Sequence, residues 1–135
     1  MNKQDLLIYS SITDLLVAIQ DNRLRFDALR QPVQWEIAFH IEQAELTNNS
    51  IDISGISALT NHSRNTIKKQ VSALTEAGYV TTVTDPNDNR RKILRSTEKL
   101  RSELEKFAKS LSPTITRASY EIQNRIWADP AEDSN

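Results

Sequence analysis

The stretch ISGISALTNHSRNTIKKQVSALTEAGYVTTVTDPNDNRRKILR, residues 53–95, decides the fold, because two helices and a hairpin can be predicted within it. We predict a short helix over residues 54–59, followed by a polar break at residues 60–63. Asn61 and Ser63 are residue types that favour helix N-caps, so a second helix starts at this break. The first part of the stretch therefore predicts two helices joined by a tight polar turn.

The second helix of this pair has one apolar face and one polar face. Ile67, Val71 and Leu74 follow one another at positions i, i+4 and i+7, which is the spacing of a single helix face. Gly78 stands where a glycine commonly ends a helix. Polar side chains lie away from the apolar face: Arg64, Asn65, Lys68, Lys69 and Ser72.

A β-hairpin with a basic tip follows the helices. Residues 79–84 are rich in β-branched and aromatic side chains and predict a strand, and residues 91–95 predict the returning strand. Between them, residues 85–88 form a turn with Pro86 at its second position. The segment NRRK, residues 89–92, places three cations near this turn, where no core packing requires them. This order and spacing of elements is that of a winged helix.

The polar helix face suits the major groove of DNA, which admits one α-helix and exposes base edges to the residues near its N-terminal end. Arg64 can form two hydrogen bonds with guanine, and Asn65 can do the same with adenine. Each such pair is worth about 1–3 kcal/mol of discrimination between bases. Neighbouring hydroxyls and ammonium groups can hold phosphates: Ser63, Thr66, Lys68 and Lys69.

The basic hairpin can reach backbone phosphates or a narrow minor groove beside such a helix. Asp88 stands two residues before Arg90 and could orient its guanidinium through a charge-assisted hydrogen bond, although an Asp in a turn is also ordinary. The candidate DNA-binding residues are Ser63, Arg64, Asn65, Thr66, Lys68, Lys69, Asp88, Arg90, Arg91 and Lys92.

The charges of the chain are segregated, although the net charge is only −1. Residues 61–95 carry seven Lys/Arg and three Asp/Glu, whereas residues 1–60 carry four and eight, and residues 96–135 carry six and seven. A solvated helix face also carries Lys and Arg, so the helix alone does not decide between DNA binding and an ordinary surface. The basic hairpin favours DNA binding.

The segments on both sides of this region predict further helices. Apolar residues at helical spacing cover more than one face of residues 4–29, which indicates either contact with a second subunit or a central core helix. Pro32 opens a helix over residues 32–46, and Ile51 and Ile53 are interpreted as a very short strand.

The C-terminal part predicts two helices separated by a break. Ser96 or Thr97 caps the first, which ends at the pair Ser112-Pro113, and the second covers residues 113–127. The acidic tail at residues 129–135 is expected to be frayed.

Residues 56–97 resemble the winged helix of the MarR-type transcription regulators. The segment SRNTI, residues 63–67, is similar to the Ser-x-x-Thr-Val start of that family's recognition helix, and Leu74-x-x-x-Gly78-Tyr79-Val80 is similar to its end. Asp88 and Arg90 match its Asp-x-Arg wing motif, and Thr97 stands where the family has a Leu-Thr pair. The sequence departs from the family pattern at Thr60, His62, Ser96 and Leu100.

The resemblance implies that Arg90 is a wing-tip arginine in the minor groove, positioned by Asp88. It also implies a homodimer, with residues 1–31 as an N-terminal dimerisation helix, 32–97 as the winged helix-turn-helix lobe, and 98–128 as C-terminal dimerisation helices. An effector pocket for small aromatic or phenolic compounds would lie between the dimer helices and the DNA lobes, with no residues assigned to it.

Other classes of function find little support in the composition. The chain has no cysteine, which excludes disulfides and thiolate chemistry and agrees with a cytoplasmic location. His40 and His62 are the two histidines, and without Cys they do not predict a metal site. No phosphate loop or nucleophile motif is present, so we expect neither an enzyme nor a cofactor, and the N-terminus predicts neither a signal peptide nor a membrane helix.

The sequence therefore predicts a mainly α fold with a small β-hairpin wing, a winged helix-turn-helix between N- and C-terminal dimerisation helices. The expected function is a homodimeric, sequence-specific transcription regulator, a repressor by the family resemblance, that binds a pseudo-palindromic operator in double-stranded DNA. The alternative is a winged-helix module for protein interaction or assembly, which the modest net charge would suit.

Overall fold

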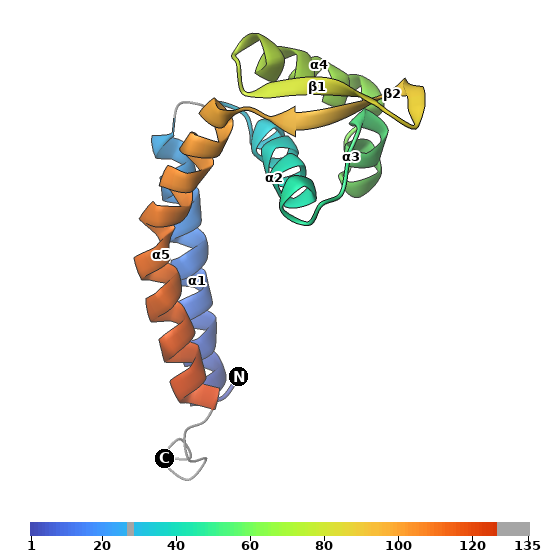
Figure 1. The fold of residues 1–135 in the computed structure, drawn as a ribbon. Coiled ribbons are helices and arrows are strands. Elements are labelled where there is room, and N and C mark those ends of the chain that lie inside the picture. The colour runs from blue at the N-terminus through green and yellow to red at the C-terminus, as the bar shows by residue number, and fades with distance from the viewer. Residues whose placement is uncertain (27–28, 127–135) are drawn as a thin grey trace. The chain divides into compact units, whose positions relative to one another are not determined.

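The computed structural model describes residues 1–26 and 29–126. Within these residues the chain is mainly helical with a two-stranded hairpin, which confirms the predicted fold class. The chain forms two compact units, one from α1 and the part of α5 after Leu104, and the other from Ala28–Leu104. The elements follow one another in this order (Figure 1): α1 (Lys3–Arg25), α2 (Pro32–Leu46), α3 (Ile53–Leu59), α4 (Arg64–Glu76), β1 (Val80–Asp85), β2 (Asp88–Ser96) and α5 (Glu98–Ile126).

The Ala28–Leu104 unit has an apolar core that is built around α2. Pro32 opens this helix as predicted, at a position where its missing amide hydrogen costs no helical bond. The indole Nε1 of Trp35 donates to the carbonyl of Leu29 at 3.0 Å, so its polar atom is satisfied inside the core. All elements of the unit contribute buried side chains: Trp35, Ile37, Ala38, Ile41, Ile56, Ile67, Val71, Leu74, Val80, Ile93, Leu94 and Leu100.

The predicted helix-turn-helix is formed by α3 and α4, and side-chain caps define where both helices begin. The carboxylate of Asp52 accepts a hydrogen bond from the amide of Gly55 at 2.7 Å. At the start of α4, the hydroxyl of Ser63 accepts one from the amide of Thr66 at 3.2 Å, which confirms Ser63 rather than Asn61 as the N-cap.

The turn between these helices is held by polar side chains. Thr60 donates to the carbonyl of Ile56 at 2.9 Å, and Ser57 donates to the carbonyl of His62 at 2.8 Å. The imidazole Nε2 of His62 lies 2.6 Å from a carboxylate oxygen of Glu36 on α2. Thr60 and His62, which depart from the family pattern, therefore each have a specific partner for the side chain, Thr60 on α3 and His62 on α2.

The strand predicted at Ile51 and Ile53 is wrong, because Ile53 is the first residue of α3. The carbonyl of Ile51 does accept a hydrogen bond from the amide of Leu94 on β2 at 2.8 Å. Asp52 then caps α3, so the chain turns into the helix before a second residue can pair with β2. The result is a single backbone hydrogen bond between this segment and the hairpin in the described part of the chain.

The hairpin begins directly after α4. Gly78 has φ of 82°, the left-handed conformation that was predicted for the residue ending this helix. β1 and β2 pair antiparallel from Val80 opposite Ser96 to Thr84 opposite Lys92. The next pair joins Asp85 to Asp88, so residues 89–91 bulge out of the ladder. β2 therefore starts at Asp88, earlier than the predicted residue 91.

The start of α5 is bonded to the end of α4. Thr97 caps α5 by accepting from the amide of Leu100 at 3.3 Å, and its hydroxyl donates to the carbonyl of Gly78 at 2.6 Å. The ammonium of Lys99 donates to the carbonyl of Ala77 at 2.7 Å and lies 4.5 Å from the ring centre of Tyr79. A cation at this place also stabilises the C-terminal dipole of α4.

The other unit is a pair of antiparallel helices (Figure 1). Ser11 of α1 donates to Glu121 of α5 at 2.8 Å, and Ser110 of α5 donates to Asn22 of α1 at 2.9 Å. α1 ends at Arg25, before the predicted end at residue 29, and residues 27–28 lie outside the described part. The tail expected at residues 129–135 also lies outside it, as does Trp127.

The predicted break at Ser112-Pro113 is wrong, because α5 continues through Pro113. Phe107, Leu111 and Ala118 are buried at positions i, i+4 and i+11, so one apolar face runs past the proline. Burial of this face outweighs the cost of about 3 kcal/mol that a proline imposes inside a helix.

Candidate nucleic-acid interface

α4 presents its predicted polar face to solvent. Ser63, Arg64, Asn65, Thr66, Lys68 and Lys69 are all exposed. Ile67 on the opposite face is fully buried, and Val71 and Leu74 are nearly so. The division of this helix into an apolar and a polar face is therefore confirmed.

The polar side chains of α4 differ in how they are held. The hydroxyl of Ser63 donates to that of Thr66 at 3.0 Å, so both side chains belong to the helix cap. Arg64 donates to the hydroxyl of Ser54 on α3, which holds its guanidinium beside the first helix of the pair. Asn65, Lys68 and Lys69 make no hydrogen bond or ion pair within the described residues.

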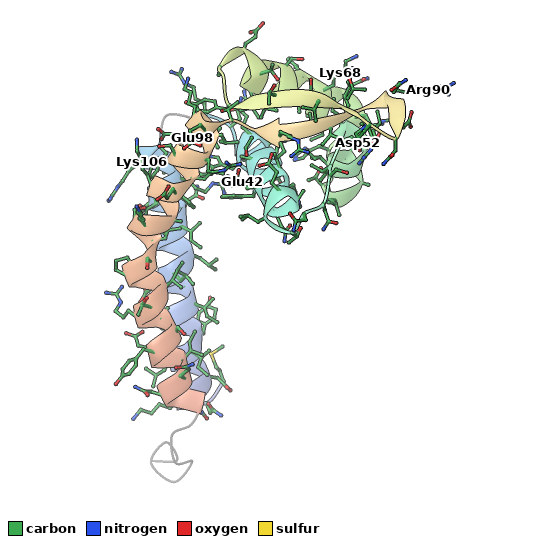
Figure 2. All side chains as sticks on the ribbon, in the orientation of Figure 1. Glu42, Asp52, Lys68, Arg90, Glu98 and Lys106 are labelled. Atoms are coloured by element: carbon green, nitrogen blue, oxygen red, sulfur yellow. The ribbon has the colours of Figure 1, made fainter. Side chains whose placement is uncertain are left out.

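The hairpin tip presents Arg90. Figure 2 shows this side chain at the end of the hairpin and Lys68 on α4. Arg90 is exposed, and its guanidinium has no hydrogen bond or ion pair within the described part of the chain. The carboxylate of Asp88 accepts from the backbone amide of Arg90 at 3.0 Å, so the hypothesis that it orients the guanidinium is wrong. An Asp two residues before an amide closes an Asx-turn, which orients the backbone instead.

Arg91, the next residue, points into the unit and bonds three side chains. Its Nε donates to Asp52 at 2.9 Å, and its Nη1 donates to Ser50 at 3.0 Å and to Asp85 at 3.1 Å. Lys92 donates to Thr84 across the hairpin at 2.7 Å. Among the described residues, the structure thus distinguishes Arg90, whose side chain has no partner, from Arg91 and Lys92, which bond other side chains.

The charges around Arg91 shift the ionisation of its neighbours. Burial raises the pKa of Asp52, but hydrogen bonds from the Gly55 amide and Arg91 outweigh it and hold that pKa below its usual value. The pKa of Asp85 is lowered by the amide of Asn87 and by Arg91. Hydrogen bonds to Asp52 and Asp85 raise the pKa of Arg91 itself. These three groups therefore stabilise one another in their charged forms.

Sequence reasoning missed the partners of these side chains. Asp52 could have been found as an N-cap, since it stands two residues before the helix predicted over residues 54–59 and Asp is a residue type that favours this position. No local pattern indicated Ser50, Ser54 or Asp85 as partners of arginines, because those contacts depend on the tertiary fold.

A second polar cluster lies where β2 ends. The amide of Ser96 donates to Glu45 at 2.8 Å, and its hydroxyl lies against the carboxylates of Glu42 and Glu45. Arg101 donates to Glu45 at 2.8 Å. Ser96, another departure from the family pattern, is therefore bonded to α2.

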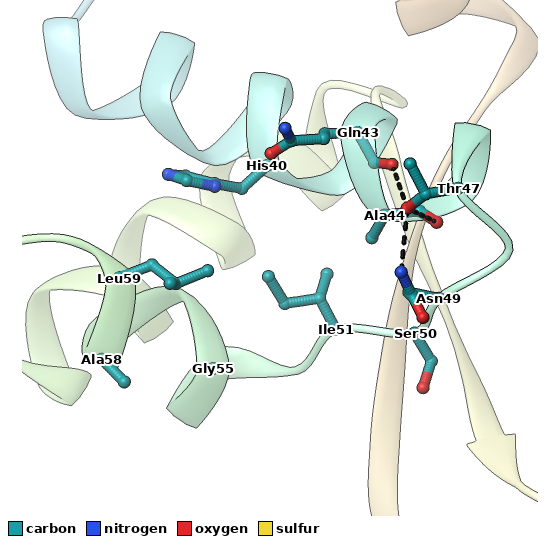
Figure 3. A pocket seen from close by; sticks show the side chains of 10 residues that line it. All are labelled: His40, Gln43, Ala44, Thr47, Asn49, Ser50, Ile51, Gly55, Ala58 and Leu59. Atoms are coloured by element: carbon teal, nitrogen blue, oxygen red, sulfur yellow. Dashed lines mark hydrogen bonds between the residues drawn. The ribbon is translucent and has the colours of Figure 1, made fainter.

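A cavity of about 630 Å³ lies between α2 and α3 (Figure 3). Its lining mixes small apolar side chains with hydroxyls, amides and the imidazole of His40: His40, Gln43, Ala44, Thr47, Asn49, Ser50, Ile51, Gly55, Ala58 and Leu59. It contains no Lys, Arg, Asp or Glu, so it does not extend the cationic surface. Within residues 1–26 and 29–126, no three potential ligands gather for a metal ion, and no helix is long and apolar enough to cross a membrane.

Residues 31–99 match the family model described as the winged helix DNA-binding domain, which is 69 of the 135 residues. The chain belongs to this family. The matched residues lie entirely within the Ala28–Leu104 unit, and α4 is the second helix of the helix-turn-helix that they contain. No curated protein sequence matches the chain.

Solved structures of MarR-type regulators share the fold of this winged helix protein and of its flanking helices. The apo form of MarR from E. coli has a TM-score of 0.61 at 15% identity, covering 95% of this chain and 88% of that one. The transcriptional regulator Tm0710 from Thermotoga maritima has a TM-score of 0.66 at 20% identity, covering 87% and 79%. A mutant MarR from E. coli complexed with operator DNA has a TM-score of 0.61 at 15% identity, covering 95% and 85%. The resemblance seen in the sequence is therefore confirmed at the level of the fold.

Proposed function

We propose that this winged helix protein is a sequence-specific transcription regulator that binds operator DNA as a homodimer. The observation that carries the proposal is the pair of cationic elements in one unit: the polar face of α4 and the exposed guanidinium of Arg90 at the hairpin tip. The family supports contact with DNA, and the likeness to a MarR solved with operator DNA supports an operator as the target. Repression is proposed from the likeness to the Multiple Antibiotic Resistance Repressor, MarR.

The role that we propose for each side chain in DNA binding follows from its contacts within the protein. Asn65 is exposed and its side chain makes no hydrogen bond within the described residues, and Arg64 is exposed near the N-terminal end of α4, so both are proposed to read base edges in the major groove. Lys68 and Lys69 are proposed to bind phosphates on either side of the groove. Arg90 would enter the minor groove or bind its phosphates.

The homodimer is proposed from the exposed apolar face of α1. Leu6, Tyr9, Leu16 and Leu24 are between 56% and 73% exposed, and Tyr120 of α5 is 65% exposed. Ser11 and Asn22, which bond α5, are not part of this exposed set. A run of large apolar side chains that its own unit leaves uncovered is typical of an interface, and a second copy would cover it. Two copies would bind half-sites about 10–10.5 base pairs apart.

Selection from a pool of random duplexes tests this function. The protein is incubated with the pool, bound duplexes are amplified over several rounds, and the enriched fragments are sequenced. The proposal predicts a pseudo-palindrome whose halves are about one helical turn apart. Enrichment of no sequence, together with no retention of any duplex, would favour the alternative of a protein-interaction module.

A further inference from the structure

Arg90 and Arg91 are neighbours in the bulge of β2 but face different surroundings. Arg90 is exposed and free within the described residues, whereas Arg91 is partly buried and bonds Ser50, Asp52 and Asp85. The three bonds hold the side chain of Arg91 against the segment before α3 and the end of β1, while the side chain of Arg90 stays exposed at the tip. The sequence placed both arginines in one basic patch, and the structure gives them different contacts.

The two carboxylates that bind Arg91 also hold the backbone of the elements they come from. Asp52 uses one oxygen for the amide of Gly55, which caps α3, and the other for Arg91. Asp85 uses one oxygen for the amide of Asn87 in the hairpin turn, and the other for Arg91. Arg91 therefore joins the first helix of the helix-turn-helix to the tip of the hairpin.

From these contacts we propose that Arg91 is a positioning residue, which locks the hairpin tip to α3 so that Arg90 is held ready for DNA. Arg91 itself does not bind DNA. The inference rests on the proposed function, and it corrects the assignment of Arg91 to the DNA-binding set.

The hairpin needs such an anchor. A two-stranded hairpin is marginally stable by itself. Nearer its base, the hairpin is bonded to the segment before α3 by the amide of Leu94 and the carbonyl of Ile51, 2.8 Å apart. Arg91 attaches the other end of the hairpin to the same segment, at the bulge beside the turn. Ordering the tip before DNA arrives lowers the entropy cost of binding, which strengthens the contact made by Arg90.

A direct phosphate contact by Arg91 is the competing explanation, and its geometry is unfavourable. The guanidinium would have to leave two carboxylates and one hydroxyl to reach a phosphate. A charge-assisted bond between arginine and carboxylate is among the stronger hydrogen bonds in proteins, so this exchange gains little.

Four variants separate the two explanations: Arg91→Ala, Arg91→Lys, Asp52→Asn and Arg90→Ala. Lysine keeps the positive charge but lacks the planar guanidinium, whose several N–H groups bond three partners at once. A positioning role for Arg91 therefore predicts that Arg91→Lys binds DNA as weakly as Arg91→Ala. Asparagine can still cap α3, and it raises the net charge by one, so a phosphate contact predicts that Asp52→Asn binds DNA more tightly. A positioning role for Arg91 predicts instead that Asp52→Asn binds DNA more weakly than the wild-type protein.

The measurement is the affinity for a duplex selected by the wild-type protein, titrated at several salt concentrations. We expect Arg91→Ala, Arg91→Lys and Asp52→Asn each to weaken binding by about an order of magnitude, which is within the usual coupling between residues that share a network. Their salt slopes should equal the wild-type slope, whereas Arg90→Ala should lower the slope by about 1. Adding Arg91→Ala to Arg90→Ala should cause little further loss.

The opposite pattern would overturn the inference: a lower salt slope in Arg91→Ala, losses that add to those of Arg90→Ala, or tighter binding by Asp52→Asn. Urea unfolding checks that each variant is folded, and if Arg91→Ala is not, Arg91→Lys and Asp52→Asn carry the test. If the wild-type protein itself prefers no duplex, the proposed function fails instead, so the two failures are distinguishable.

Discussion

At the scale of single residues, the start of α4 combines a helix cap with two candidate base readers. Ser63 and Thr66 bond each other and the helix backbone. This leaves Arg64 and Asn65, in the first turn, as the side chains that we propose to contact base edges. Arg64 is held by Ser54 before any DNA arrives, which limits the number of conformations that it loses on binding.

Replacing Arg64 or Asn65 by Ala should therefore relax sequence preference. We expect each change to weaken binding to the selected duplex by about 1–3 kcal/mol while leaving binding to a random duplex nearly unchanged. Competition between the two duplexes measures this difference. Ser72→Ala, an exposed and uncharged position of the same helix, is the control and should change neither affinity. Equal losses on both duplexes would show that Arg64 and Asn65 do not read sequence.

The lowered pKa values of Asp52 and Asp85 predict a loss of stability in acid. A carboxylate whose folded pKa lies below its unfolded value stabilises the fold above the unfolded pKa, near 4, and this contribution is lost as the pH falls through the folded pKa. The contribution of these two carboxylates to the free energy of unfolding, measured in urea, should be constant between pH 7 and pH 5. It should decrease below about pH 4. Asp52→Asn should have a smaller acid dependence than wild type, whereas Ser72→Ala, which removes an exposed hydroxyl and no carboxylate, should keep the wild-type dependence. The same acid slope in Asp52→Asn and wild type would contradict the role of the Arg91 contacts.

At the scale of elements, the sequence predicted the features that depend on local interactions and missed those that depend on contacts between distant residues. α2 covers the predicted residues 32–46 because Pro32 and the polar residues after Leu46 act locally. The same holds for Ser63 and Gly78 at the ends of α4. The partners of Arg91 could not be predicted, because Asp52 lies 39 residues away and meets it only in the folded chain.

The continuous α5 is the clearest case in which packing overrides a local pattern. Pro113 lacks the amide hydrogen that a helix needs, and the sequence therefore predicted an end there. Phe107, Leu111 and Ala118 form one buried face across it, which a break would divide.

Pro113→Ala should stabilise this helix. Alanine restores the missing hydrogen bond, so we expect the free energy of unfolding to rise by about 1–3 kcal/mol, with DNA affinity unchanged. Urea unfolding measures the change, and Ser112→Ala in the same turn is the control with a much smaller effect. If the variant gained no stability, Pro113 would be ending a helix as the sequence suggested, rather than lying inside one.

At the scale of the whole molecule, the exposed side of α1 predicts the state of assembly. Tyr9 and Leu16 lie seven residues apart, about two helical turns, and both are more than half exposed. We expect Leu16→Glu to convert a dimer into a monomer, because a charge buried in an apolar interface without a partner is costly. Light scattering measures the mass in solution, and Leu16→Met, which keeps the apolar surface, should remain a dimer. A wild-type protein that is monomeric at micromolar concentration would contradict the dimer.

The central claim is that α4 and the hairpin together form a sequence-specific DNA-binding surface. Its most direct test is the affinity of the Arg64→Ala/Arg90→Ala double variant for the selected duplex, titrated at several salt concentrations beside the wild-type protein. We predict a large loss of affinity, a salt slope that is lower by about 1 because the contact of Arg90 is lost, and a loss of preference over a random duplex because Arg64 no longer reads bases. A double variant that binds with the wild-type affinity, slope and preference would contradict the account.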